Sequence, residues 1–177
     1  MKLYFNLKKF SMINWIRITK VFSFTALLSL LVLSLQAQEI TKMNIKDLES
    51  YIQKSEHPLV VNFWATFCVP CVKEIPTFEK IISTYKDKQV ELILVSLDLP
   101  DSYPAKIENF ARDRQFSSSI IWLNETNADY FCPRIDKKWS GGIPSSLFIN
   151  NRNHFKKFFE SELNANQFEE NIKKMVE

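Results

Sequence analysis

The chain has 177 residues, of which 46% are hydrophobic and 24% charged, and this length allows one domain with its own core. The formal net charge of +3 comes from the first 37 residues, which hold five basic and no acidic side chains, so residues 38–177 carry a net charge of −2. Because no basic patch with interleaved aromatic residues remains in that part, we expect no nucleic-acid partner.

The N-terminal stretch has the layout of a secretory signal. Its basic residues precede an apolar run over residues 21–35, and we expect cleavage after Ala37, although Leu35 occupies a position that prefers a small residue. The alternative is an uncleaved membrane anchor, but a run of 15 residues with three serines and one threonine is shorter than the ~20 apolar residues of a spanning helix. Residues 1–37 are therefore predicted to be a signal and residues 38–177 an exported domain, in the periplasm or at the extracytoplasmic face of the membrane.

Hydrophobic periodicity predicts alternating helices and strands after the signal. The two best strands are apolar on both faces except at Asn62, and connections of helix length require them to pair in parallel. These patterns predict an α/β domain that a hairpin and a last helix complete. The expected helices cover residues 45–52, 69–86, 104–111, 128–139 and 165–176, and the expected strands cover 59–64, 90–97, 146–150 and 155–159, with 117–123 as an extra strand or an extended connection.

Two cysteines in the order Cys68-Val-Pro-Cys71 lie where the strand 59–64 passes into the next helix. The first turn of a helix has free N–H groups and the positive end of the helix dipole, and both favour a thiolate at Cys68. The thiolate is the nucleophile. Cys71 follows three residues later on the same face, where it can attack a mixed disulfide that Cys68 has formed. This spacing predicts an attacking and a resolving cysteine.

A zinc site and a purely structural disulfide are the competing interpretations of this motif. Zinc needs four ligands, and besides the pair the chain offers only Cys132, His57 and His154, with no second pair of cysteines at this spacing. A structural bridge over so short a loop removes little entropy from the unfolded chain. Redox chemistry is therefore favoured. We expect Cys132 to be a buried, inert thiol, although it could also resolve an intermediate or form an intermolecular bridge.

The two glycines of the chain, Gly141 and Gly142, stand directly before Ile143-Pro144 and a predicted strand. So local a concentration of glycine indicates a sharp turn or a close approach of the backbone to another group. An ordinary trans peptide bond before Pro144 is the alternative to a cis one.

Both motifs resemble those of the thioredoxin superfamily. The pattern Trp64-Ala-x-x-Cys68-x-Pro-Cys71 after an apolar strand looks like its active site, and the longer form that runs on to Pro76 is similar to the TlpA/ResA-like branch of exported thiol-disulfide oxidoreductases. The resemblance covers about residues 40–177. It implies a thioredoxin fold, with a central mixed sheet of four to five strands flanked by helices, and a cis-proline loop.

The resemblance also implies the roles of individual residues. Cys68 would attack and Cys71 resolve, and the backbone of Ile143, before a cis Pro144, would pair with an extended substrate segment. Trp64 and Phe67 would contact that substrate. Phe67 departs from the family pattern, which usually has tryptophan before the first cysteine.

Glu74 matches the acidic residue that assists proton transfer in this branch. Cytoplasmic thioredoxins carry a buried aspartate where this chain has Asn62, so Glu74 is the only nearby carboxylate candidate. Most glutamates at such helical positions are simply exposed. If Glu74 is instead partly buried beside Cys71, its pKa should rise and it could exchange protons with that thiol.

The function implied is reduction of disulfides in exported proteins, of the kind needed for apocytochrome c. Its partners would be those substrates and a membrane electron donor. The resemblance implies no cofactor beyond the Cys68–Cys71 dithiol. We expect a monomer. Two alternatives remain open: an oxidant of the same fold that donates its disulfide, because the Val-Pro dipeptide does not fix the reduction potential, and a non-catalytic thioredoxin-like binding module.

Overall fold

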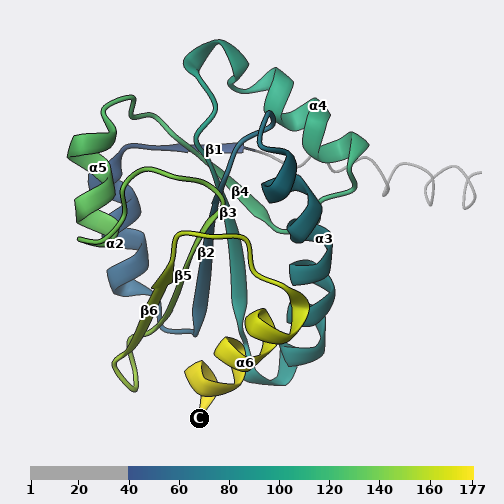
Figure 1. Cartoon of the computed structure of the whole chain (residues 1–177), viewed down its shortest axis with the longest axis vertical. Helices are drawn as coiled ribbons and strands as arrows, with labels where there is room; N and C mark the ends of the chain where they lie inside the picture. The colour runs from purple at the N-terminus through teal and green to yellow at the C-terminus, as the bar shows by residue number, and fades with distance from the viewer. Residues whose placement is uncertain (1–39) are drawn as a thin grey trace, which may run out of the picture. The chain divides into compact units, whose positions relative to one another are not determined.

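The computed structural model describes residues 40–177 (Figure 1). The predicted signal, its cleavage after Ala37 and the alternative anchor lie outside these residues. Within residues 40–177, no helix combines the length and the apolar character that crossing a membrane requires.

The centre of the fold is a mixed sheet with the strand order β1-β4-β3-β2-β5-β6. The first four strands in this order run parallel, and β5 is antiparallel to both β2 and β6. The strands are β1 (Ile40–Met43), β2 (Leu59–Trp64), β3 (Glu91–Ser96), β4 (Ser119–Leu123), β5 (Ser145–Asn150) and β6 (Phe155–Phe159). The thioredoxin fold with a mixed sheet is thus confirmed, and the sheet has one strand more than the four to five expected.

Helices cover both faces of this sheet (Figure 1). Helices α2 (Ile45–Lys54) and α5 (Ala128–Ile135) lie on one face, and α3 (Val69–Ile82), α4 (Ala105–Asp113) and α6 (Ala165–Val176) lie on the other. Two short 3₁₀ helices, η1 (Ser83–Lys88) and η2 (Pro100–Ser102), complete the set. The predicted motif helix therefore ends as an α-helix at Ile82, and the stretch up to Lys88 continues it in tighter turns.

Strand β2 carries the motif because both of its faces are buried. All six of its residues are buried, and alternate side chains enter different cores. Val60 and Trp64 pack in the core with α3, α4 and α6, whereas Val61 and Phe63 pack in the core with α2 and α5. Asn62 has the same parity as Val60 and Trp64, so its polar side chain enters the α3 side of the molecule.

Strand β1 is the element that the sequence pattern did not indicate. It has only four residues, of which one, Ile40, is buried, and its partner β4 lies about 80 positions away, with Ile40 opposite Ile120. The same pairing settles residues 117–123, because Ser119–Leu123 is strand β4 between β1 and β3. Pro133, whose position in its helix the sequence left open, lies inside α5.

Candidate active site

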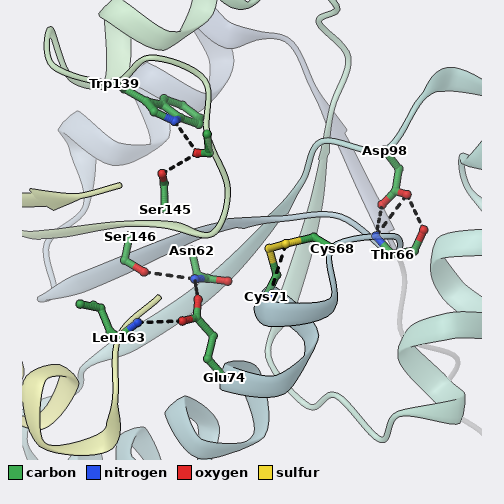
Figure 2. The surroundings of a disulfide bond; sticks show 11 residues. Asn62, Thr66, Cys68, Cys71, Glu74, Asp98, Trp139, Ser145, Ser146 and Leu163 are labelled. Carbon is green, nitrogen blue, oxygen red and sulfur yellow. Dashed lines mark hydrogen bonds between the residues drawn. A yellow bond between two sulfur atoms is a disulfide. The ribbon is translucent and has the colours of Figure 1, made fainter. Parts of the chain in front are cut away.

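The two motif cysteines form a disulfide at the start of α3 (Figure 2). Cys68 is the N-cap of the helix, and its sulfur accepts a hydrogen bond from the backbone N–H of Cys71 at 3.4 Å. Cys68 is 8% exposed and Cys71 0% exposed. The bridge is therefore largely covered, and its small exposed part belongs to Cys68, the residue expected to attack, while Cys71 is fully buried.

A carboxylate just after the neighbouring strand, β3, anchors the loop between β2 and Cys68. Asp98 follows β3 and is 4% exposed. It accepts hydrogen bonds from the backbone N–H of Thr66, at 3.2 and 3.0 Å to its two oxygens, and from the Thr66 hydroxyl at 2.5 Å (Figure 2). It also accepts one from the Ser96 hydroxyl at 2.8 Å. Because β2 and β3 are parallel, their carboxyl ends lie at the same edge, and Asp98 thereby fixes the approach to the motif.

Glu74 lies one turn beyond Cys71 and is buried, with 4% of its surface exposed. One carboxylate oxygen accepts a hydrogen bond from the Asn62 side-chain amide at 3.0 Å, and the other accepts one from the Leu163 backbone N–H at 3.0 Å (Figure 2). Burial raises the pKa of Glu74 to about 7, although these two hydrogen bonds act to lower it, and the nearby charge of Glu162 adds to the rise. A proton can thus leave or join this group near neutral pH.

The glycine-rich loop lies beside the motif because β5 pairs with β2. The register places Ser145 opposite Phe63, so Ile143-Pro144 comes next to the end of β2 from which the cysteines follow. The Ile143–Pro144 peptide bond is cis, as the resemblance predicted. Gly141 has a φ of +101°, a conformation that glycine adopts without strain and that explains the residue there.

The side chains of Trp139, Ser145 and Glu160 make hydrogen bonds to the backbone of this loop. The Gly142 carbonyl accepts hydrogen bonds from the Trp139 indole at 2.9 Å and the Ser145 hydroxyl at 2.7 Å (Figure 2). Glu160, just after β6, accepts hydrogen bonds from the Gly142 backbone N–H at 2.7 Å and from the backbone and hydroxyl of Ser140. Partial burial acts to raise the pKa of Glu160, but these hydrogen bonds outweigh it and lower the pKa below its ordinary value.

The structure separates the two aromatic residues that were expected to contact substrate. Phe67 is 69% exposed beside Cys68 and can meet a bound partner. Trp64 is 0% exposed and packs against Phe110 and Phe116, so the expectation that it contacts substrate is wrong in this state. The physical reason is that both faces of β2 are buried, and the position of Trp64 places its indole in the core with α3 and α4. Two further large apolar side chains near the motif, Val69 and Leu99, are as exposed as Phe67.

The third cysteine, Cys132, packs in the core between the sheet and α2 and α5, and the disulfide packs in the core on the other face of the sheet. Cys132, on α5, is buried as predicted, and burial raises the pKa of its thiol to about 11, which keeps it protonated. Residues 40–177 contain no group of three or more His, Cys, Asp or Glu side chains placed to hold a metal ion. Sequence reasoning missed Asp98 and Glu160. A polar residue at the end of a buried parallel strand could have indicated Asp98, but nothing in the sequence around Glu160 indicates its contact with Gly142.

Comparison with known proteins finds relatives that are named thiol-disulfide oxidoreductases or thioredoxin-related proteins. A thiol-disulfide oxidoreductase ResA of Bacillus thuringiensis subsp. konkukian is 30% identical over 119 residues, which are 66% of this chain and 62% of that protein. The ResA of Halalkalibacterium halodurans is 30% identical over 90 residues, 51% of this chain and 46% of its own length. The chain thus spans about half to three fifths of these relatives. A solved thioredoxin-related protein from Neisseria meningitidis serogroup B matches with a TM-score of 0.56 and 25% identity, over 71% of this chain and 87% of the other.

The fold and the site together define a thioredoxin-fold protein with a dithiol/disulfide centre at a helix N-terminus. The model of the AhpC/TSA family matches residues 31–156, which is more than half of the chain. The chain belongs to this family.

Proposed function

We propose that this protein is a thiol-disulfide oxidoreductase that reduces disulfides in other proteins. The observation that carries the proposal is the Cys68–Cys71 disulfide at the start of α3, in which Cys68 keeps 8% of its surface exposed and Cys71 none. The relatives named thiol-disulfide oxidoreductases support it.

The reaction uses both sulfurs in turn. In the reduced protein, the Cys68 thiolate attacks a substrate disulfide, and one substrate sulfur leaves as a thiolate that takes up a proton. Cys71 then loses its proton and attacks Cys68, so that the second substrate sulfur leaves and the Cys68–Cys71 bond forms. Two electrons pass from the protein to the substrate, and a dithiol donor must return them before the next cycle.

Glu74 is the group we assign to the proton of Cys71. It lies on the same helix one turn later, it is buried, and its pKa of about 7 lets it take a proton as the resolving thiol ionises. Each of its oxygens accepts one hydrogen bond, from Asn62 and from Leu163, and each keeps a further lone pair that can take a proton.

We also propose where the protein acts and on what. The predicted signal over residues 1–37 supports export to a compartment outside the cytoplasm. There, disulfide-bearing proteins such as apocytochrome c would be the substrates, and a membrane protein would supply electrons. The exposed Phe67 and the backbone of Ile143 supply the contacts for a substrate segment, and we propose that the protein acts as a monomer without a further cofactor.

The test is to trap the mixed disulfide. A Cys71→Ser variant should accumulate a covalent complex with a disulfide-bearing protein such as insulin, and the wild-type protein should reduce insulin while Cys68→Ser does not. Absence of both the complex and the reduction would reject the proposal and leave a binding module. Equilibration with a glutathione buffer then gives the direction, because a potential near that of thioredoxin fits a reductant and one near that of DsbA fits an oxidant.

A further inference from the structure

Asn62 has a buried oxygen without a hydrogen-bond partner. Its side chain is 0% exposed, and its amide nitrogen donates to Glu74 at 3.0 Å and to the Ser146 hydroxyl at 3.1 Å. Its Oδ1 has no hydrogen-bond partner among residues 40–177. An unpaired acceptor in a protein interior loses its hydrogen bond to water without replacement, so it calls for an explanation.

The unpaired oxygen points toward the disulfide (Figure 2). Asn62 lies on the face of β2 that packs against α3, in the core that also contains Cys71. The partners of the nitrogen, Glu74 and Ser146, lie on the other side of the amide group. The carboxamide therefore stands between the Glu74 carboxylate and the cysteine pair, with its acceptor on the sulfur side.

In the oxidised protein neither sulfur can donate a hydrogen bond to this oxygen, because a disulfide carries no proton. Reduction by a dithiol donor breaks the Cys68–Cys71 bond, adds two electrons and two protons, and converts the donor into a disulfide. The new Cys71 thiol is in the core, since this residue is 0% exposed, and a thiol is a weak hydrogen-bond donor that needs an acceptor there.

We propose that Asn62 Oδ1 is the acceptor for the Cys71 thiol in the reduced protein, and that the amide connects this thiol to Glu74. This inference rests on the proposed function and identifies the group that holds its resolving thiol. The contact exists only after reduction, so it stabilises the reduced form relative to the disulfide. The redox equilibrium of the cysteine pair is therefore shifted toward the dithiol.

The Asn62→Leu variant tests this shift, because leucine has similar size and no acceptor. We expect the disulfide of this variant to be favoured by about tenfold over wild type in a dithiothreitol redox buffer, which corresponds to a potential lower by ~30 mV. Ser146→Ala is the matched control. It removes a partner of the same amide nitrogen and keeps Oδ1, so its equilibrium should remain close to that of wild type. An Asn62→Leu equilibrium equal to wild type, or shifted toward the dithiol, would overturn the proposal.

A second measurement needs no change at Asn62 and covers the case in which the leucine variant does not fold. In a Cys68→Ser, Cys132→Ala double variant, Cys71 is the single thiol, and its S–H stretching band in the infrared should be at the lower frequency of a hydrogen-bonded thiol. A band at the frequency of a free thiol contradicts the proposal. Neither readout uses a protein substrate, so a failure of insulin reduction would reject the proposed function without touching this result.

Discussion

The surroundings of the Glu74 carboxyl group disfavour its charged form. Burial removes it from water and raises its pKa to about 7, against the ordinary value of 4.5 that it keeps in the unfolded chain. Between these two values the folded protein binds more protons than the unfolded chain. Its free energy of unfolding therefore falls as the pH rises through that window, and is lowest, as far as this group is concerned, above pH 7.

The Glu74→Gln substitution should remove this pH dependence. Between pH 4 and pH 8 the free energy of unfolding of the oxidised variant should rise by about 3 kcal/mol relative to that of wild type, so the variant gains stability, whatever the fixed cost of the changed contacts. Urea unfolding of both proteins across this range measures the difference. The pH dependence of insulin reduction should shift as well, because the variant cannot take up the Cys71 proton.

Parallel stability curves for the two proteins would mean that Glu74 titrates in the folded state as it does in the unfolded one. Glu79→Gln makes the same chemical change on the same helix at a half-exposed position, and it controls for the general effect of losing a negative charge from α3.

At the scale of elements, the loop before β5 depends on Glu160, which the end of β6 supplies. Oε1 of Glu160 is 2.8 Å from the position that a Cβ atom on Gly142 would occupy. A side chain at Gly142 must displace the carboxylate, which then loses its hydrogen bonds to Gly142 and Ser140. Glycine at position 142 therefore leaves room for the Glu160 carboxylate. Glycine at position 141 is instead required by the backbone φ of +101° there.

A double-mutant cycle distinguishes these two roles of glycine. Gly142→Ala should lower the free energy of unfolding by about 1–3 kcal/mol in wild type and cost little in a Glu160→Ala background, where the displaced group is gone. Gly141→Ala should destabilise both backgrounds equally, because its strain comes from the backbone. Urea unfolding of the six proteins measures the cycle, and an equal cost of Gly142→Ala in both backgrounds would show that Glu160 does not restrict this position.

These elements show what the sequence could and could not predict. The CxxC motif, the strand before it and the closing helix are local patterns, and the structure confirms where they lie because hydrophobic periodicity and helix signals act over short distances. The Glu74 contact to Leu163 spans 89 positions and the Asn62 contact to Ser146 spans 84, and no local pattern encodes such pairs. Trp64 was assigned to the substrate from the resemblance alone, whereas the apolar pattern on both faces of residues 59–64 already indicated a strand buried on both sides.

For the whole molecule, the charge distribution agrees with a chain in two parts. The basic residues of the first 37 positions form the start of the predicted signal, while residues 38–177 have a net charge of −2 and the fold described above. Stable disulfides occur mostly outside the cytoplasm, because most cytoplasmic thiols are kept reduced. The exported substrates proposed above therefore require that residues 1–37 direct residues 38–177 across a membrane.

Export of the full-length chain in a Gram-negative host tests this requirement. We expect the N-terminus of the exported protein to be Gln38, determined by N-terminal sequencing of the periplasmic fraction. Leu35→Ala places small residues at both positions that signal peptidase recognises and should increase the fraction cleaved at the same bond, whereas Leu30→Arg should block export by placing a charge in the apolar run. A chain that stays in the membrane fraction with its N-terminal stretch intact, in wild type and Leu35→Ala alike, would identify that stretch as the anchor. A wild-type chain found only in the cytoplasm would reject export and, with it, the proposed substrates.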